Sequence, residues 1–264
     1  MLRILVLAVV LGSLTFAQTV TTVQTVTTTT VACVYEGWAP PIDILTLELR
    51  EAYCMCPPVC DPCYEAKAVV ASVAGGVFAA NVLRSGGWEL KGSVSVPACR
   101  REVSLTFSVP NDASAIGLNV WTGGRWVQSV DIYGINAVCP AALVPPKIDS
   151  VEVDGDFRIR VYVKAPASNN TLRVEVVGPT SFTQTKRINI GRFGGAACVT
   201  LIVNFGPYKL KPGNYKAKVV LETSLGRDEK EISFQVPDGC HTVTVTTTVT
   251  QTTTTTVTQT VTTT

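Results

Sequence analysis

The sequence of 264 residues lacks most of what an enzyme active site requires. It has one histidine, and it contains no Gly-x-Ser-x-Gly, no His-Glu-x-x-His and no glycine-rich phosphate loop, the short motifs that carry nucleophilic, metal and phosphate chemistry. Charged residues make up only 16% of the chain and nearly balance, with a formal net charge of +2. This charge pattern argues against nucleic acid or an anionic membrane surface as a partner. We therefore expect a non-enzymatic protein with no cofactor and no catalytic residue.

Long apolar runs are also scarce. The one such run spans residues 4–14, behind the basic Arg3 and ahead of the small residues Thr15 and Ala17. This pattern predicts a secretory signal peptide at residues 1–17, with an uncleaved N-terminal anchor as the alternative. Because no second apolar segment follows, we expect an extracellular or cell-surface protein with no transmembrane anchor after signal cleavage.

Nine cysteines stand out against these absences. In an exported chain they indicate disulfides, and an odd number leaves at least one free, bound to metal or paired with another chain. The densest group, Cys54, Cys56, Cys60 and Cys63, could also wrap a tetrahedral zinc ion, but only its last two members have Cys-x2-Cys spacing. We expect no metal and mainly intrachain disulfides, with metal or interchain disulfides as alternatives for this group. The disulfide candidates are Cys33, Cys54, Cys56, Cys60, Cys63, Cys99, Cys139, Cys198 and Cys240.

Few long runs of helix formers and abundant valine, glycine and proline favour an all-β protein. Between residues 147 and 236, alternating stretches are separated by turn signals such as Asp154-Gly155, which predicts an antiparallel sandwich of about seven strands. The segment Leu210-Lys-Pro-Gly-Asn-Tyr215 resembles the Pro-Gly-x-Tyr corner of immunoglobulin-like and fibronectin-like modules, a resemblance that concerns fold rather than function. The predicted strands are residues 147–153, 157–163, 172–177, 184–190, 198–205, 215–223 and 229–236.

The first half of the chain predicts a second sandwich. Alternation covers residues 93–96, 102–109, 116–121 and 125–133, with a hairpin at Gly123-Gly124, while residues 42–53 fit either a short helix or a strand. The expected architecture is two tandem immunoglobulin-like antiparallel β-sandwiches flanked by extended Thr/Val arms. Its divisions are a signal peptide at 1–17, an N-terminal arm at 18–32, a cysteine-rich sandwich at 33–144, an immunoglobulin-like sandwich at 145–240 and a C-terminal arm at 241–264.

The C-terminal arm has the side-chain period of a β-strand. Residues 242–264 contain only Thr, Val and Gln, and every even-numbered position is Thr. Because successive side chains of a strand point to opposite faces, the extended arm presents a threonine face and a valine-bearing face. The valines of this predicted strand-donation face are Val243, Val245, Val249, Val257 and Val261.

Two further features bear on modification and binding. Asn169-Asn-Thr171 is a glycosylation sequon in a predicted loop, so Asn169 is the candidate for modification. Three aromatic residues of the first half fit core packing best, with a ligand-binding face as the alternative: Trp121, Trp126 and Tyr133.

Three interpretations of the arms compete. In the first, an arm adds as a strand to an open sheet edge of a neighbouring subunit, and repetition of this contact builds a filament. In the second, the threonines carry O-linked sugars and the chain forms a stalk, although this does not explain the alternation. In the third, the arms are tethers and the sandwiches bind a partner protein or ligand. A metal-binding or hydrolytic secreted protein is a remote alternative.

Thr/Val/Gln-rich arms flanking immunoglobulin-like domains resemble exported surface proteins of thermophilic archaea. That resemblance implies a threonine-rich stalk, usually ahead of a C-terminal anchor, or a filament subunit that assembles by donor-strand complementation. Because we find no C-terminal anchor in this sequence, we favour the second. We expect a cell-surface structural protein that associates with itself, or with another surface protein, through its arms.

Overall fold

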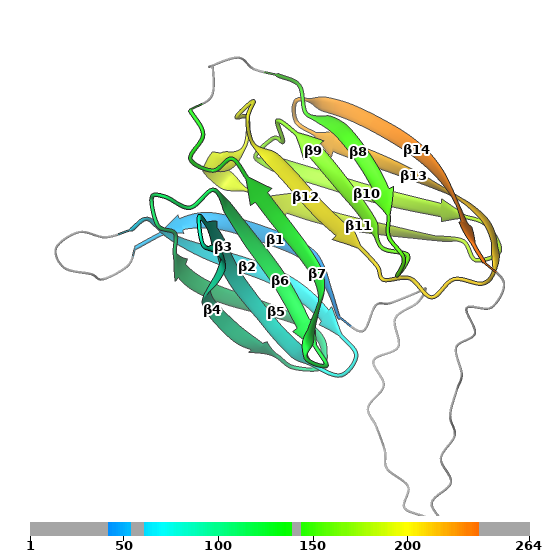
Figure 1. Ribbon diagram of the computed structural model, residues 1–264, viewed down its shortest axis with the longest axis horizontal. Coiled ribbons are helices and arrows are strands. Elements are labelled where there is room, and N and C mark those ends of the chain that lie inside the picture. Colours follow the sequence, from blue (N-terminus) through cyan, green and yellow to red (C-terminus); the bar gives the residue numbers. More distant parts are fainter. Residues whose placement is uncertain (1–41, 54–60, 139–143, 238–264) are drawn as a thin grey trace, which may run out of the picture. The chain divides into compact units, whose positions relative to one another are not determined.

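A computed structural model describes residues 42–53, 61–138 and 144–237. These residues form strands and a 3-10 turn, η1 (Gly191–Phe193), so the fold is all-β as predicted. None of the described residues form a helix long and apolar enough to cross a membrane. The strands (Figure 1) are β1 (Ile42–Ala52), β2 (Cys63–Ser72), β3 (Gly76–Arg84), β4 (Gly87–Val96), β5 (Cys99–Ser108), β6 (Ala115–Thr122), β7 (Arg125–Tyr133), β8 (Lys147–Val153), β9 (Ile159–Lys164), β10 (Asn169–Val177), β11 (Phe182–Asn189), β12 (Thr200–Phe205), β13 (Gly213–Thr223) and β14 (Gly226–Val236).

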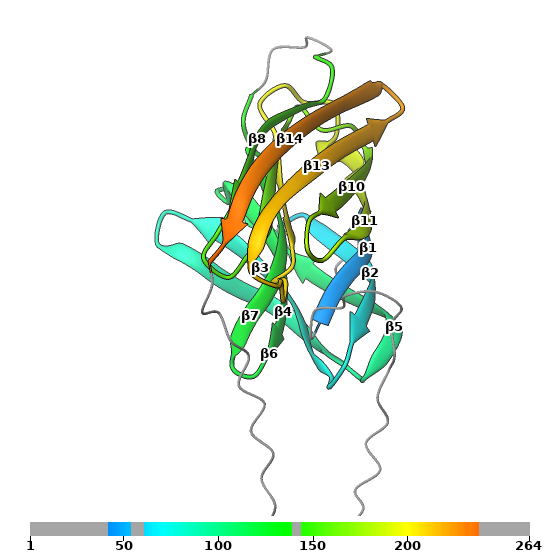
Figure 2. The ribbon, with the colours of Figure 1, turned by 90° about the vertical axis from the view of Figure 1, so that its right-hand side faces the viewer.

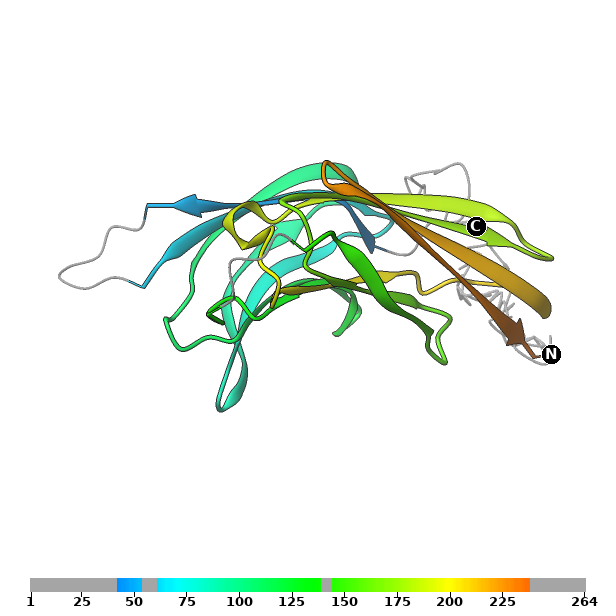
Figure 3. The ribbon, with the colours of Figure 1, turned by 90° about the horizontal axis from the view of Figure 1, so that it is seen from above.

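The strands form two seven-stranded sheets that stack as two layers (Figure 3). Sheet A has the order β14-β13-β10-β11-β1-β2-β5, and sheet B has the order β4-β3-β6-β7-β12-β9-β8. The first seven strands place β1, β2 and β5 in sheet A and the other four in sheet B. The last seven strands show the same division with the sheets exchanged, because β8, β9 and β12 lie in sheet B and the other four lie in sheet A. Three strands facing four is the arrangement of immunoglobulin-like and fibronectin-like sandwiches, so the predicted fold class is confirmed.

Hydrogen bonds continue each sheet from one half of the chain into the other. In sheet A, β1 pairs with β11 in parallel, with Thr46 opposite Arg187 and Glu48 opposite Asn189. In sheet B, β7 pairs with β12 antiparallel. All the described residues belong to one compact unit. The predicted division at residue 145 falls between β7 and β8, where one set of seven strands ends, and the domain limits themselves stay a prediction.

The core lies between the two sheets and follows strand alternation. On β9, Ile159, Val161 and Val163 are fully buried, whereas Arg160 and Tyr162 between them are only partly covered. The same alternation along the other strands gives each sheet an inner apolar face and an outer, more polar face. Burial of the inner faces is the main source of stability.

One pair of edge strands is tied together across the layers. β14 of sheet A and β8 of sheet B lie side by side (Figure 2). The Ile148 backbone N–H donates to Asp228 Oδ2 at 2.7 Å, and Lys230 Nζ donates to the Asp149 carbonyl at 2.8 Å. β14 also carries five consecutive charged residues, 227–231. Charges at a sheet edge oppose further strand pairing.

Every strand predicted from alternation corresponds to a strand of the structure. Residues 42–53, left open between helix and strand, form β1. The sequence failed to predict β2 and β3, because both are rich in alanine and β2 adds Glu65 and Lys67, residues that favour helices. Their buried positions show that packing between the sheets overrides this propensity.

The predicted turns are confirmed. Gly123 and Gly124 both have positive φ, 59° and 78°, which the short hairpin between β6 and β7 requires. Asp154 Oδ1 accepts from the backbone N–H groups of Asp156 and Arg158 at 3.0 Å, closing the turn between β8 and β9. The buried Tyr215 donates its hydroxyl to the Lys211 carbonyl at 2.8 Å, which completes the tyrosine corner.

Several predicted features lie outside the described residues. They are the signal peptide, both arms with all five valines of the strand-donation face, and the six cysteines Cys33, Cys54, Cys56, Cys60, Cys139 and Cys240. Of the described cysteines, Cys63, Cys99 and Cys198 are engaged with partners rather than free thiols. Disulfide pairing of the nine stays a prediction.

Candidate ligand-binding face

The outer face of sheet B carries a hollow of about 420 Å³. It crosses six neighbouring strands, from β4 to β9, and therefore uses both halves of the chain. Aromatic rings and short polar side chains share its surface. Its lining residues are Asn81, Trp88, Asn119, Trp121, Trp126, Ser129, Asp131, Tyr133, Arg160, Tyr162, Ile202 and Asn204.

Strand alternation places these side chains on one face. On β7, Ser129, Asp131 and Tyr133 line the hollow, while Val130 and Ile132 between them are fully buried in the core. A register shift at Val120/Trp121 interrupts the pairing of β6 with β7. Such irregularities re-aim side chains near the end of a strand.

The aromatic residues of the hollow lie outside the core between the sheets, which corrects the core packing expected for Trp121, Trp126 and Tyr133. Trp121 is exposed, and Trp126 and Tyr133 are partly buried. Trp88 is 46% exposed and Trp121 is 36% exposed. The Trp88 and Tyr133 rings meet edge to face with centroids 6.2 Å apart. The Arg158 guanidinium lies 4.8 Å from the centroid of the Trp126 ring. These contacts hold the rings in place at the rim, because aromatic pairs and cation–π contacts are directional.

A chain of hydrogen bonds connects the polar side chains at the base of the hollow. Arg160 Nε donates to Asn204 Oδ1 at 3.0 Å, and Asn204 Nδ2 donates to Ser129 Oγ at 2.7 Å. Ser129 Oγ in turn donates to Asp131 Oδ2 at 2.9 Å. A connected network of this kind presents donors and acceptors in fixed directions.

Asp131 is the titratable group at this base. Burial raises its pKa from an ordinary 3.8 to about 6, against the opposing effects of the Ser129 hydrogen bond and the nearby positive charge of Arg160. Burial also raises the pKa of Tyr133, with a smaller contribution from Asp131. The base therefore holds a carboxyl group that titrates above the usual range of aspartate.

Gly117 lies directly against the Trp88 ring. A Cβ at this position would lie 2.9 Å from Trp88 Cζ3 and 3.0 Å from Asp131 Oδ1. No side chain fits there without moving the indole ring, so the absence of a side chain at Gly117 shapes the hollow.

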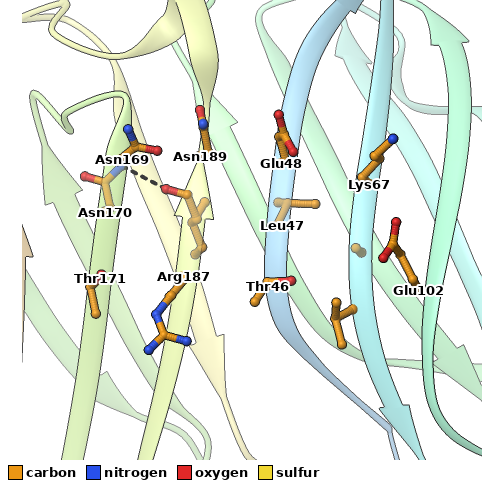
Figure 4. Close-up of a pocket in the computed structure, with 13 residues that line it drawn as sticks. Thr46, Leu47, Glu48, Lys67, Glu102, Asn169, Asn170, Thr171, Arg187 and Asn189 are labelled. Carbon is orange, nitrogen blue, oxygen red and sulfur yellow. Dashed lines mark hydrogen bonds between the residues drawn. The ribbon is translucent and has the colours of Figure 1, made fainter.

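A second hollow, of about 320 Å³, lies on the outer face of sheet A across the β1–β11 junction. Figure 4 shows Thr46, Glu48 and Lys67 on one side of this junction, facing Arg187 and Asn189 on the other. Its lining mixes polar and aliphatic side chains and contains no aromatic residue. The sequon was predicted to lie in a loop, but its residues begin strand β10 instead. Asn169 is exposed and lines this hollow, so the site is accessible, and its glycosylation stays a prediction.

Of the four metal candidates, only Cys63 lies among the described residues. Cys63 is buried at the start of β2, and the other three members of its group lie outside the described residues. No group of three or more His, Cys, Asp or Glu side chains within the described ranges is arranged to hold a metal ion.

Comparison with known proteins adds little. No protein-family model matches the sequence, and no curated protein matches it. Among solved structures, the chain is similar to one described as "Biofilm associated protein - BSP domain", with a TM-score of 0.24 and 14% sequence identity. The match covers 67% of this chain and 28% of that one. A likeness at this TM-score supports no conclusion about function.

Proposed function

We propose that this protein is a non-enzymatic component of the cell surface and that the hollow of sheet B binds a carbohydrate chain. The observation that carries the proposal is that three indole and two phenol groups share one hollow with a network of hydrogen-bonded polar side chains. Sugar rings have apolar C–H faces and hydrogen-bonding hydroxyl edges. Aromatic side chains with a polar handle match the faces, while Asn, Asp and Arg side chains supply donors and acceptors for the edges.

The composition of the hollow favours binding over hydrolysis. Glycoside hydrolases use two carboxyl groups that flank the scissile bond. Among the residues that line this hollow, Asp131 is the single carboxylate. A bound sugar would therefore meet one acid and an extended aromatic rim, as in a binding module.

The test is glycan binding by the mature protein, first on a glycan array and then by calorimetry with the selected oligosaccharide. Trp121→Ala should weaken binding about tenfold or more, because an aromatic anchor typically contributes over about 1.4 kcal/mol. Leu90→Ala is the matched control, since Leu90 is 62% exposed on β4 but does not line the hollow. Absence of binding to any glycan, or equal loss in both variants, would reject this function.

A second candidate is self-assembly by strand donation from the Thr/Val arms, favoured by the edge strand β5. Among the described strands, β5 pairs with β2 alone. Its second half, residues 103–108, has no charged residue. There the buried or partly buried Val103, Leu105 and Phe107 alternate with Ser104 and Thr106, so the odd positions face inward. An arm added beside β5 would continue this apolar row with its own valines.

The arm interpretation is tested by negative-stain microscopy of the mature chain beside a version that ends at Cys240. Filaments or ordered multimers that occur only with the arm support strand donation. Val245→Lys should weaken assembly more than Thr246→Lys, because a charge on the valine face would be buried. Monodisperse particles in both samples, or equal effects of the two substitutions, argue for tethers or stalks.

A further inference from the structure

A set of polar side chains lies inside the sandwich, between the sheets and at the junction of the two halves. Lys186 on β11 is buried, as are Asp43 on β1 and Gln128 on β7. Lys186 Nζ lies 2.5 Å from Asp43 Oδ1 and 2.5 Å from Gln128 Oε1. None of the three lines the hollow of sheet B.

The surrounding groups fix these three side chains. Gln128 Nε2 donates to the Gly206 carbonyl at 2.5 Å, and the Ile44 backbone N–H points at Gln128 Oε1 from 3.5 Å. Gln184 Nε2 donates to Asp43 Oδ2, and Tyr208 donates its hydroxyl to Gln184 Oε1 at 2.6 Å. The Phe205 ring covers the amine, with its centroid 5.2 Å from Nζ.

This environment shifts the amine toward its neutral form. Burial lowers the pKa of Lys186, against the raising effect of Asp43. A buried lysine with a lowered pKa is a nucleophile, and a carboxyl group beside it can accept and return a proton. A carboxamide whose oxygen faces N–H donors is polarised for attack at its carbon.

We propose that Lys186 and Gln128 form an intramolecular amide cross-link, with Asp43 as the proton shuttle. The link would join β11 to β7 and thus sheet A to sheet B, and the second half of the chain to the first. It needs no cofactor, since the nucleophile, the electrophile and the acid–base group are all in place.

The reaction balances as a transamidation. Asp43 takes a proton from the Lys186 ammonium group, and the neutral Nζ attacks Gln128 Cδ. The new Nζ–Cδ bond forms as the Cδ–Nε2 bond breaks, and Asp43 passes its proton to the departing nitrogen. The departing nitrogen also takes up the second proton, which Nζ loses as the amide forms. Ammonia leaves as ammonium, Asp43 returns to its carboxylate form, and the chain loses one positive charge.

The test is the intact mass of the full mature protein after denaturation, reduction and alkylation, so that disulfides do not affect it. We expect a mass below the sequence mass by one ammonia molecule. Trypsin should then fail to cleave after Lys186 and should release one branched peptide, in which residues 126–147 are joined to residues 174–187. The wild-type protein decides the question alone, because no variant has to fold.

Asp43→Asn supplies the mechanistic control, since it keeps the shape of the side chain but removes the acid–base group. The variant should retain its full sequence mass and show both peptides separately. An unmodified wild-type mass would overturn the proposal. Loss of one water molecule with a Lys186–Asp43 peptide would also overturn it, because the electrophile would then be the carboxyl group.

Discussion

The sequence predicts the burial of some individual residues but not their partners. Lys186 shares strand parity with the apolar Ile188 and Ile190, and that pattern alone marks a lysine on an inward face. Its partners lie far away in the sequence, at Asp43 and Gln128, so their meeting could not be predicted without the sheet order. Charged residues inside a core are rare unless paired.

At the scale of one residue, Asp131 makes stability depend on pH. Its pKa is about 6 in the folded state and 3.8 as an ordinary value, so the folded protein binds the proton more tightly. The stabilisation is therefore complete below about pH 4 and is lost as the pH rises through about 6. Asp131→Asn should remove this component, worth about 1–3 kcal/mol.

The measurement is urea unfolding of wild type and Asp131→Asn at several pH values across that window. The difference between the two free energies of unfolding isolates Asp131 from the other carboxylates, which titrate in both proteins. A difference that stays constant with pH would show that Asp131 has an ordinary pKa.

Tyr215 allows a second test with a matched control. Its buried hydroxyl bonds the Lys211 carbonyl, and its ring stacks on Phe234 with centroids 5.4 Å apart. Tyr215→Phe should lower the free energy of unfolding by about 1–2 kcal/mol, because the carbonyl loses its partner. Tyr162→Phe, which loses a bond to exposed Glu152, should change it by about 0.5 kcal/mol or less. Equal losses of unfolding free energy in the two variants would show that the hydrogen bond from Tyr215 to the Lys211 carbonyl does not stabilise the fold.

At the scale of the element, alternation predicted the strands whose side chains differ sharply between faces. All seven strands of the second half were found, and β7 was predicted with its observed limits. The alanine-rich β2 and β3 were missed because alanine is compatible with either face and favours helices. A ligand-binding face at Trp121, Trp126 and Tyr133 was only the alternative prediction, because alternation separates the two faces of a strand without showing which of them the other sheet covers.

The edge strand β5 can be tested as the acceptor of an added arm. If β5 receives an arm, Thr106→Lys should reduce assembly, because a lysine on an uncharged edge obstructs pairing. Ser233→Lys is the control, since Ser233 is exposed on β14, whose edge is already charged. Microscopy and sedimentation of both variants measure the effect. Assembly that resists Thr106→Lys but not Ser233→Lys would move the acceptor to the other edge.

At the scale of the whole molecule, the sequence predicted two sandwiches but not their fusion. Local patterns specify strands and turns, whereas the pairing of β1 with β11 joins residues distant in the sequence. A continuous pair of sheets therefore follows from three-dimensional packing.

The fusion predicts that neither half folds alone. Residues 33–144 without their partner would expose the β1 and β7 edges together with buried Asp43 and Gln128, and residues 145–240 would expose β11, β12 and Lys186. Open apolar edges lead to aggregation, so each half should be insoluble or unfolded by circular dichroism and gel filtration. Two monomeric, folded halves would contradict this prediction.

The exchange of sheets between the halves also has a mechanical consequence. Ordinary tandem sandwiches are joined by a peptide linker, about which they swivel and extend under load. Here a rotation of one half of the chain against the other would have to break hydrogen bonds in both sheets at once, between β1 and β11 and between β7 and β12. The fourteen described strands should therefore transmit tension as a single rigid unit.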